Sequence, residues 1–248
     1  MKIICGWNRL CFYSLIDALG SFFPQDVNTK MIRNIIWDLD GTLFDTYPAI
    51  AGAFQAGLAD LGKEAPLGWI ESLSKKSMGF CLTTLAETYA LSEDELDRKF
   101  IERYDQIRSE DQPPFPGVRR LCEYIYSIGG KNCIVTHRRQ VGTVSLLAAH
   151  HLTSYFAGFL TNDDGYPKKP DPAAFNAILE KYALERVETL AVGDRDIDVL
   201  AGRAAGLLTC LFGPAIPGIT VDLTVSNFDE LHNYILAVNS TAQFVSEN

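Results

Sequence analysis

Short apolar runs separated by amphipathic stretches are the main pattern of this 248-residue chain. From Met31 onward, apolar runs bounded by turn-forming residues alternate with stretches of helical periodicity, which predicts buried strands joined by helices. This alternation favours an α/β fold with a doubly wound parallel sheet. The predicted strands are Ile35–Leu39, Asn132–Thr136, Gly158–Thr161, Thr189–Val192 and Leu207–Phe212, and the clearest helices beside them are Val118–Ile128 and Asp171–Tyr182.

One long segment interrupts the alternation. Between Asp45 and Pro116 the sequence has helical periodicity and no convincing strand. Ser92 followed by three acidic residues is typical of a helix N-terminus. The run Pro113-Pro114-Phe115-Pro116-Gly117 is stiff and predicts a hinge back to the sheet. We expect residues 47–115 to form a helical domain, either a lid over the first strand's loop or a packing unit without a catalytic part. Its predicted helices are Tyr47–Leu61, Leu67–Ser74, Phe80–Tyr89 and Glu93–Arg108.

The first thirty residues differ from the rest of the chain. Met1–Lys30 is rich in aromatic residues and cysteine, and Arg9 and Asp17 interrupt its apolar run. The run is therefore shorter than the ~20 apolar residues of a membrane span. Asp17 inside the apolar stretch also argues against a signal peptide, although a targeting role is the alternative. We expect residues 1–30 to be a disordered or loosely docked leader, and residues 31–46 and 116–240 to form the α/β core.

Composition narrows the range of functions. The chain has 22 basic and 31 acidic residues and a formal net charge of −9, which disfavours nucleic acid and anionic membranes as partners. An anionic substrate therefore needs locally placed cations or a metal ion. The six cysteines show no Cys-x-x-Cys pair, which is typical of reduced, mostly buried thiols in a cytoplasmic protein. We expect a monomer or a homodimer.

The candidate chemistry begins where the first predicted strand ends. The apolar run stops at Asp38-Leu39-Asp40-Gly41-Thr42, which puts two carboxylates one residue apart at the edge of the sheet. Unpaired carboxylates are costly at such a position, so they call for a metal ion or a reacting group beside them. The less specific alternative is a turn in which Asp is favoured only for its turn chemistry.

Three later segments place polar residues at or near strand ends, where open α/β sheets bind their ligands. The strand at Asn132–Thr136 ends in a hydroxyl residue. Lys168-Lys169-Pro170 precedes a predicted helix. In Gly193-Asp194-Arg195-Asp196-Ile197-Asp198, Asp194 and Asp198 are one helical turn apart and can face one point, whereas Asp196 falls on another side.

The four segments together resemble the four signatures of the haloacid dehalogenase superfamily, in the expected chain order from Asp38 to Asp198. The Asp-x-Asp-Gly-Thr string with its upstream strand is the most specific of them. The resemblance covers about residues 31–236 and points to the helical-cap, phosphoglycolate phosphatase-like group. It implies a Rossmann-like doubly wound parallel sheet with an inserted all-helical cap, and hydrolase activity on phosphoric monoesters.

The resemblance also implies the chemistry of the first loop and its metal. Asp38 is expected to attack the phosphoryl group and form an aspartyl-phosphate. Asp40 is expected to protonate the leaving oxygen and then to activate water. Mg²⁺ is expected on the carboxylates of Asp38 and Asp194 and on the backbone carbonyl of Asp40. Asp198 is expected to hold a metal-bound water or to orient Lys169. Thr42 is expected to support the residues that bind the metal.

Phosphate binding falls, by the same resemblance, to Thr136 and Lys169. The Thr136 hydroxyl is expected to donate to a phosphoryl oxygen. Lys169 is preferred over Lys168 because it directly precedes Pro170. A lysine ammonium is a compact charge suited to bridging a nucleophile and a phosphate.

Several alternatives stay open. A sugar phosphomutase keeps every signature and differs only in how well the closed cap excludes water. Dehalogenases and phosphonatases of the superfamily lack the second Asp of the first signature, so Asp40 counts against both. A non-catalytic binding protein is disfavoured by the intact set of acidic, hydroxyl and lysine residues.

The substrate is not identified by the sequence. We expect a small phosphorylated metabolite, such as phosphoglycolate, a sugar phosphate or a nucleotide. Lys75 and Lys76 in the helical insertion are candidate substrate contacts, as is His137 with its neighbours Arg138 and Arg139. All of these residues also fit solvated positions at helix ends.

The leader is expected to be dispensable, because Met1–Lys30 carries no signature and no predicted strand. A chain that begins at Met31 should fold and keep its turnover within about threefold, a barrier change below ~0.7 kcal/mol. Thermal unfolding and phosphate release of the two chains measure this. Aggregation of the shortened chain would mean that the leader packs on the core.

Overall fold

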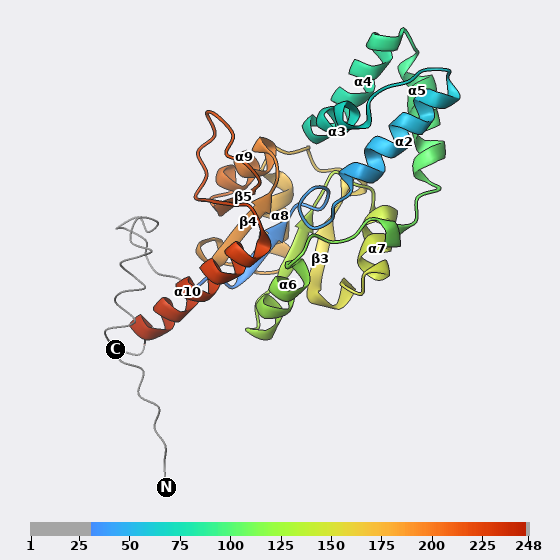
Figure 1. Cartoon of the computed structure of the whole chain (residues 1–248). Helices are drawn as coiled ribbons and strands as arrows, with labels where there is room; N and C mark the ends of the chain where they lie inside the picture. The colour runs from blue at the N-terminus through green and yellow to red at the C-terminus, as the bar shows by residue number, and fades with distance from the viewer. Residues whose placement is uncertain (1–30, 247–248) are drawn as a thin grey trace.

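Six parallel strands form one sheet in the order β3-β2-β1-β4-β5-β6 in the computed structural model, which describes residues 31–246 (Figure 1). The predicted α/β fold with a parallel sheet is therefore confirmed, and the predicted strands agree with the observed ones to within two residues. The short β6 was not predicted, because three residues carry too little apolar pattern. The predicted leader lies outside the described residues. The strands are β1 (Asn34–Trp37), β2 (Asn132–Val135), β3 (Phe156–Leu160), β4 (Thr189–Gly193), β5 (Leu208–Phe212) and β6 (Leu223–Val225).

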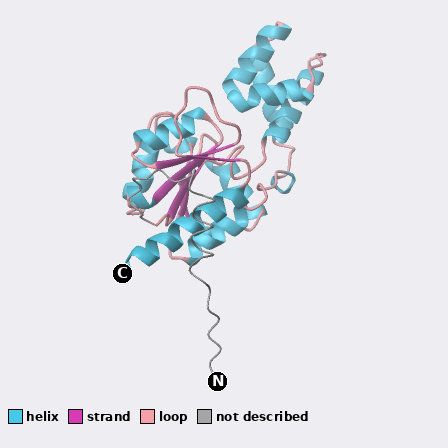
Figure 2. Cartoon of the chain, turned by 60° about the vertical axis from the view of Figure 1, so that its left-hand side comes forward, coloured by secondary structure: helices cyan, strands magenta, loops and turns pink. Residues whose placement is uncertain are grey.

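Helices cover both faces of the sheet (Figure 2). Ile35 and Trp37 of β1 pack in one cluster with α6, α7 and α10, whereas Ile36 packs in another with α8 and α9. Neighbouring strand residues thus face opposite sides, and both sides are buried, as a parallel sheet requires. No helix in residues 31–246 is long and apolar enough to cross a membrane. These helices are α6 (Val118–Ser127), α7 (Gln140–Ala149), α8 (Ala173–Lys181), α9 (Asp196–Ala204) and α10 (Phe228–Ser246).

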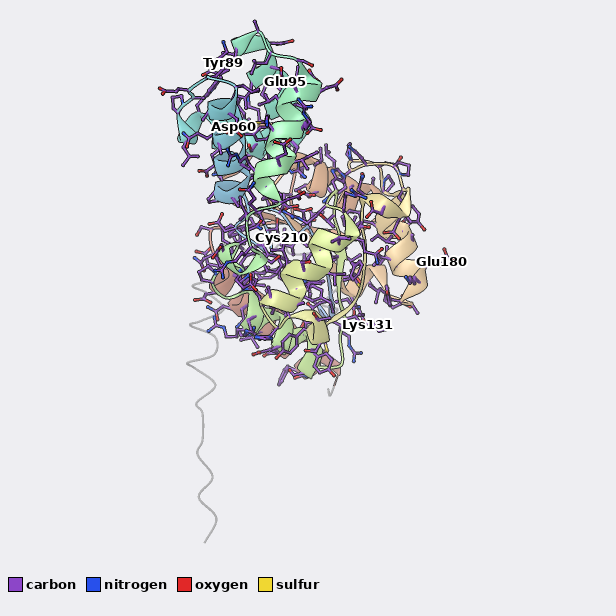
Figure 3. The ribbon with its side chains drawn as sticks, turned by 90° about the vertical axis from the view of Figure 1, so that its right-hand side faces the viewer. Asp60, Tyr89, Glu95, Lys131, Glu180 and Cys210 are labelled. Carbon is purple, nitrogen blue, oxygen red and sulfur yellow. The ribbon has the colours of Figure 1, made fainter. Side chains whose placement is uncertain are left out.

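A separate group of helices forms the predicted cap between β1 and β2. Their buried side chains make a hydrophobic cluster of their own, in which Phe54 stacks on Phe100 with ring centroids 4.2 Å apart. Figure 3 shows this cap, marked by Asp60 and Glu95, standing apart from the sheet domain. The inserted all-helical cap is thus confirmed. Its helices are α2 (Tyr47–Asp60), α3 (Leu67–Lys76), α4 (Met78–Tyr89) and α5 (Glu93–Tyr104).

Helix α5 begins at Glu93, as predicted, but its C-terminal end differs from the prediction. It ends at Tyr104 rather than Arg108, because Gln106 and Ile107 donate their backbone N–H groups three residues back and tighten the chain into a turn. Ser92 occupies the predicted N-cap position with extended backbone, but its side chain makes no capping hydrogen bond. The first turn after Ser92 is acidic, and these carboxylates interact favourably with the helix dipole, which stabilises this end of the helix.

The two connections between cap and sheet lie side by side. The backbone N–H of Asp45 donates to the carbonyl of Pro113 at 2.9 Å, and the N–H of Phe115 donates to the carbonyl of Leu43 at 3.0 Å. The outgoing and returning chains therefore form one paired hinge, with the prolines on the returning side.

A buried asparagine ties the sheet to its surroundings. The Asn132 side chain at the start of β2 accepts a hydrogen bond from Trp37 Nε1 at 3.1 Å and donates to the carbonyls of Cys122 and Tyr155 at 3.0 and 3.1 Å. Its side-chain amide thus forms hydrogen bonds to β1, to α6 and to the chain before β3.

Replacing Asn132 with Ala should lower the free energy of unfolding by about 2–4 kcal/mol, since three buried polar groups lose their partner. Equilibrium urea unfolding measures the loss. Asn162→Ala, at an exposed position, is the matched control and should stay within about 0.5 kcal/mol. Equal effects of the two changes would contradict the assigned role of Asn132.

Candidate active site

Side chains from three neighbouring strands meet at one edge of the sheet. Asp38 follows β1, Asp194 follows β4 and Thr136 follows β2. Since β1 lies between β2 and β4, the carboxyl ends of all three are adjacent. The residues predicted from separate segments are therefore brought together by the strand order.

Lys169 is the central cation of this site. Its Nζ lies 2.5 Å from Asp38 Oδ1 and 2.6 Å from Asp198 Oδ1, and it donates to the carbonyl of Val135 at 3.1 Å. The side chains of Lys169 and Asp38 are only 1% and 3% exposed. Burial alone would lower the pKa of Lys169, but the carboxylates of Asp198 and Asp38 hold it above its ordinary value, so the ammonium stays charged.

Three carboxylates gather beside this ammonium. Asp38, Asp194 and Asp198 each place an oxygen within 4.8 Å of the others. Burial, together with the neighbouring carboxylates, raises the pKa of Asp38 to about 6 and that of Asp194 to about 8. Asp38 Oδ2 is buried and has no hydrogen-bond partner among the described residues. A hard divalent cation fits this set, because it removes the repulsion among the three carboxylates.

Asp194 is held by two hydroxyl groups. Thr42 Oγ1 donates to its Oδ1 at 3.3 Å, and the Tyr47 hydroxyl donates to its Oδ2 at 2.8 Å. Gly41 makes this packing feasible, because a Cβ there would lie 2.2 Å from Tyr47 Cε2 and 2.6 Å from Asp194 Oδ2. Its φ of +80° also favours glycine. Tyr47 is the first residue of α2, so the cap reaches the acidic cluster directly.

Asp40 has a different environment from Asp38. Arg138 donates to its carboxylate from Nη2 at 2.6 Å and from Nε at 3.1 and 3.2 Å, and Thr46 Oγ1 donates at 2.8 Å. Burial opposes ionisation, but the Arg138 guanidinium prevails and holds the pKa of Asp40 below its usual value. Its side chain is 24% exposed. Asp38 is thus buried against Lys169, whereas Asp40 lies nearer the surface against Arg138.

The residues around Thr136 hydrogen-bond to one another and to the backbone of Lys169. Thr136 Oγ1 accepts a hydrogen bond from the Arg138 N–H at 3.0 Å, which leaves the hydroxyl proton free to donate. His137 Nε2 accepts from the backbone N–H of Lys169 at 2.9 Å. Burial and the Lys169 charge lower the pKa of His137 to about 4, so the ring is a neutral acceptor. His137, a predicted candidate for substrate contact, thus hydrogen-bonds to the backbone of Lys169.

The predicted cap contacts lie on an exposed helix end. Lys75 pairs with Glu71 at 2.7 Å, and its Nζ is 5.8 Å from the ring centroid of Tyr47. The Nζ of Lys76 instead lies 4.7 Å from the ring centroid of Phe80, within the cap. Lys75 is therefore the one of the two that is close to a residue of the site.

Four residues of the site were not predicted in the contacts that they make. Tyr47 and Tyr104 carry no local signal, because both resemble ordinary apolar positions of a helix. Arg138 was named only with His137, as a candidate substrate contact. Arg195 adjoins Asp194, and its buried Nε has no hydrogen-bond partner within residues 31–246 and lies 4.0 Å from Asp198 Oδ2. Only its place inside the fourth signature could have indicated it.

Comparison with known proteins identifies the class to which this site belongs. A family model described as haloacid dehalogenase-like hydrolase matches residues 35–212. Among solved structures, a hydrolase from Streptococcus pneumoniae TIGR4 is 33% identical with a TM-score of 0.59, covering 74% of this chain and 94% of that one. A predicted phosphoglycolate phosphatase from Haemophilus somnus has a TM-score of 0.73 at 21% identity, covering 84% and 99%, which shows the fold alone. The chain belongs to the haloacid dehalogenase-like hydrolases, as its four signatures predicted.

Two curated relatives are similar over most of the chain. The phosphoglycolate phosphatase of Nitrosospira multiformis is 31% identical over 191 residues, covering 74% of this chain and 82% of that protein. The phosphoglycolate phosphatase of Pseudomonas syringae pv. tomato is 30% identical over 196 residues, covering 75% and 71%.

The acidic cluster predicts metal-dependent stability. Saturating Mg²⁺ should raise the midpoint of thermal unfolding, by linkage of about 2.7 kcal/mol at ~100 times its Kd. Asp194→Asn should remove most of this shift, because a ligand charge is lost. Asp196→Asn, an exposed carboxylate two residues away, is the matched control and should keep the full shift. Equal shifts in both variants would place the ion elsewhere.

Proposed function

We propose that this chain is a Mg²⁺-dependent phosphatase that hydrolyses a small phosphomonoester through an aspartyl-phosphate on Asp38. The enzyme class is established by the family and by relatives of 30% identity: the chain is a hydrolase acting on phosphoric monoesters. The proposal is carried by one observation on the buried Asp38: Lys169 holds one of its oxygens, and the other has no hydrogen-bond partner within residues 31–246.

Asp38 is suited to nucleophilic attack. Lys169 fixes Oδ1, so Oδ2 has a defined position and no competing hydrogen bond. Attack by Oδ2 forms an oxygen–phosphorus bond, and the bond to the leaving oxygen breaks. The charged Lys169 and the Thr136 hydroxyl lie beside the nucleophile, where they would bind the other phosphoryl oxygens. Water then attacks the phosphorus of the aspartyl-phosphate and regenerates Asp38.

The carboxylates of Asp38 and Asp194, with the backbone carbonyl of Asp40, would hold the metal ion. Mg²⁺ at this position supplies positive charge that neutralises phosphoryl oxygens. Thr42 and Tyr47 hold Asp194 in its orientation. Asp198 pairs with Lys169 and thereby keeps the ammonium beside Asp38.

Asp40 would move the protons. In the first step it protonates the leaving oxygen, and in the second it accepts a proton from the attacking water. Its partial exposure at the mouth of the site supports contact with both groups. Its lowered pKa favours the carboxylate form, which the second step needs, whereas the first step needs the protonated form.

Phosphoglycolate is the first substrate to assay, because curated relatives at about 30% identity carry the name phosphoglycolate phosphatase. The sugar phosphomutase alternative has weaker support. A putative β-phosphoglucomutase from Thermotoga maritima has a TM-score of 0.71 but only 22% identity, which reports fold and not activity. Residues 47–115 would act as the lid, with Lys75 as a contact for the substrate.

The cytoplasm is the proposed compartment. Among the described residues, the cysteines are free and buried thiols, which persist in a reducing environment: Cys81, Cys122, Cys133 and Cys210. A monomer or homodimer is proposed, with a small phosphorylated metabolite as ligand and no nucleic acid or membrane.

Substitutions of Asp38 and Asp40 should affect different steps of the reaction. Asp38→Asn removes the nucleophile and should abolish turnover and phosphoenzyme for every substrate. Asp40→Asn keeps the nucleophile and loses the proton shuttle, worth about 10²–10⁴ in rate. With p-nitrophenyl phosphate, whose leaving group needs no proton, Asp40→Asn should give a burst of p-nitrophenol and a trappable aspartyl-phosphate.

Rapid-quench measurements with and without Mg²⁺ decide between these outcomes. Asp196→Asn serves again as the matched control and should retain both steps. A burst from Asp38→Asn would mean that another residue is the nucleophile. Full turnover in excess chelator would exclude the metal dependence.

A further inference from the structure

Arg138 joins two parts of the molecule that the proposed mechanism uses separately. Its Nη2 lies 2.6 Å from Asp40 Oδ1 in the loop after β1 and 2.7 Å from the hydroxyl of Tyr104 in the cap. The Arg138 side chain is 12% exposed, so solvent competes little for these bonds. Its neighbour Arg139 is 81% exposed and, among the residues that the structure describes, forms an ion pair only with Asp163.

Tyr104 is itself firmly held by the cap. Its hydroxyl donates to Gln112 Oε1 at 2.6 Å, and Gln112 is buried in the chain that returns from the cap to the sheet. Its ring stacks on Phe100, with centroids 5.4 Å apart. The Arg138 Cζ lies 5.5 Å from the Tyr104 ring centroid, a cation–π distance. The guanidinium therefore rests on a fixed surface of the cap.

Asp40 receives its remaining hydrogen bond from the other cap connection. Thr46, the residue before α2, donates to Asp40 Oδ1 at 2.8 Å. Within residues 31–246, Arg138 is the cation that hydrogen-bonds to Asp40. A two-point guanidinium contact fixes the orientation of a carboxylate as well as its charge. The side chains that hydrogen-bond to Asp40 are thus Thr46, in the connection to the cap, and Arg138, which contacts Tyr104 of the cap.

We propose that Arg138 is a positioning residue that sets the location of the acid–base carboxylate Asp40, and that Tyr104 sets the location of Arg138. The placement of the proton-transfer group then depends on the placement of the cap. This inference rests on the proposed function, because it requires Asp40 to transfer protons. A displacement of about 1 Å in a catalytic group can cost about 10²-fold in rate, so such a link has kinetic consequences.

A double-mutant cycle separates positioning from a direct contact with substrate. Arg138→Gln should lower kcat for phosphoglycolate by about 10- to 100-fold in the native background, a part of the ~10²–10⁴ assigned to proton transfer. In the Asp40→Asn background the same change should cost less than about twofold, since the group that Arg138 places is already inactive. Arg138→Lys should recover part of the loss, and KM should change little. Arg139→Gln is the matched control and should match the native enzyme.

A second pair of substitutions tests the contact between Tyr104 of the cap and Arg138. Tyr104→Phe removes the hydroxyl that meets Arg138 and should lower kcat by about 3- to 10-fold, again only when Asp40 and Arg138 are intact. Tyr89→Phe removes another cap hydroxyl, which donates to the Glu64 carbonyl far from the sheet domain (Figure 3), and should have no effect.

In the Asp40→Asn background the burst of p-nitrophenol should persist when each of these changes is added, because that step needs no proton, and it reports an intact nucleophile and fold. Loss of the burst, a raised KM, or an equal loss of kcat in both backgrounds would overturn the positioning role. The Asp40→Asn enzyme alone reports on the proposed function. If it hydrolyses phosphoglycolate at the native rate, the assignment of Asp40 fails first and the link to the cap fails with it.

Discussion

The buried ammonium of Lys169 between Asp38 and Asp198 is the interaction on which the rest of the site depends. Removing one partner of a buried ion pair typically costs about 3–5 kcal/mol, because the other charge is left without compensation. Lys169 is held from behind by the Val135 carbonyl and, through its backbone, by His137. One lysine cannot neutralise three gathered carboxylates, and the remaining negative charge makes the pocket suited to a divalent cation.

Two carboxylates one residue apart acquire opposite properties from their surroundings. Asp38 is buried, and its pKa is raised to about 6, whereas the guanidinium of Arg138 lowers the pKa of Asp40. Such a division would let the proposed nucleophile and the proposed proton carrier differ in acidity without any difference in residue type. The environment comes from distant parts of the chain, since Lys169 and Arg138 are 131 and 98 positions away from their partners.

The cap contributes side chains to the site. Tyr47 at the start of α2 contacts Asp194, and Tyr104 at the end of α5 contacts Arg138. The first cap helix thus reaches the acidic cluster, and the last cap helix reaches the arginine that binds Asp40. Because the two hinge strands are hydrogen-bonded to each other, the two contacts belong to one unit joined to the sheet at one place.

Much of this protein could be predicted from its sequence, because local patterns determine it. Apolar runs and helical periodicity indicated five of the six strands and the helical cap, and polar residues at strand ends indicated Asp38, Thr136 and Asp194. Pairwise contacts between distant segments could not be predicted in this way. The partnership of Arg138 with Asp40 and Tyr104, the contact of Tyr47 with Asp194 and the use of His137 on Lys169 depend on strand order and on the cap's docking. Only the tertiary structure decided these, because side-chain hydrogen bonds act over about 3 Å and no periodicity along the chain records which side chains come that close.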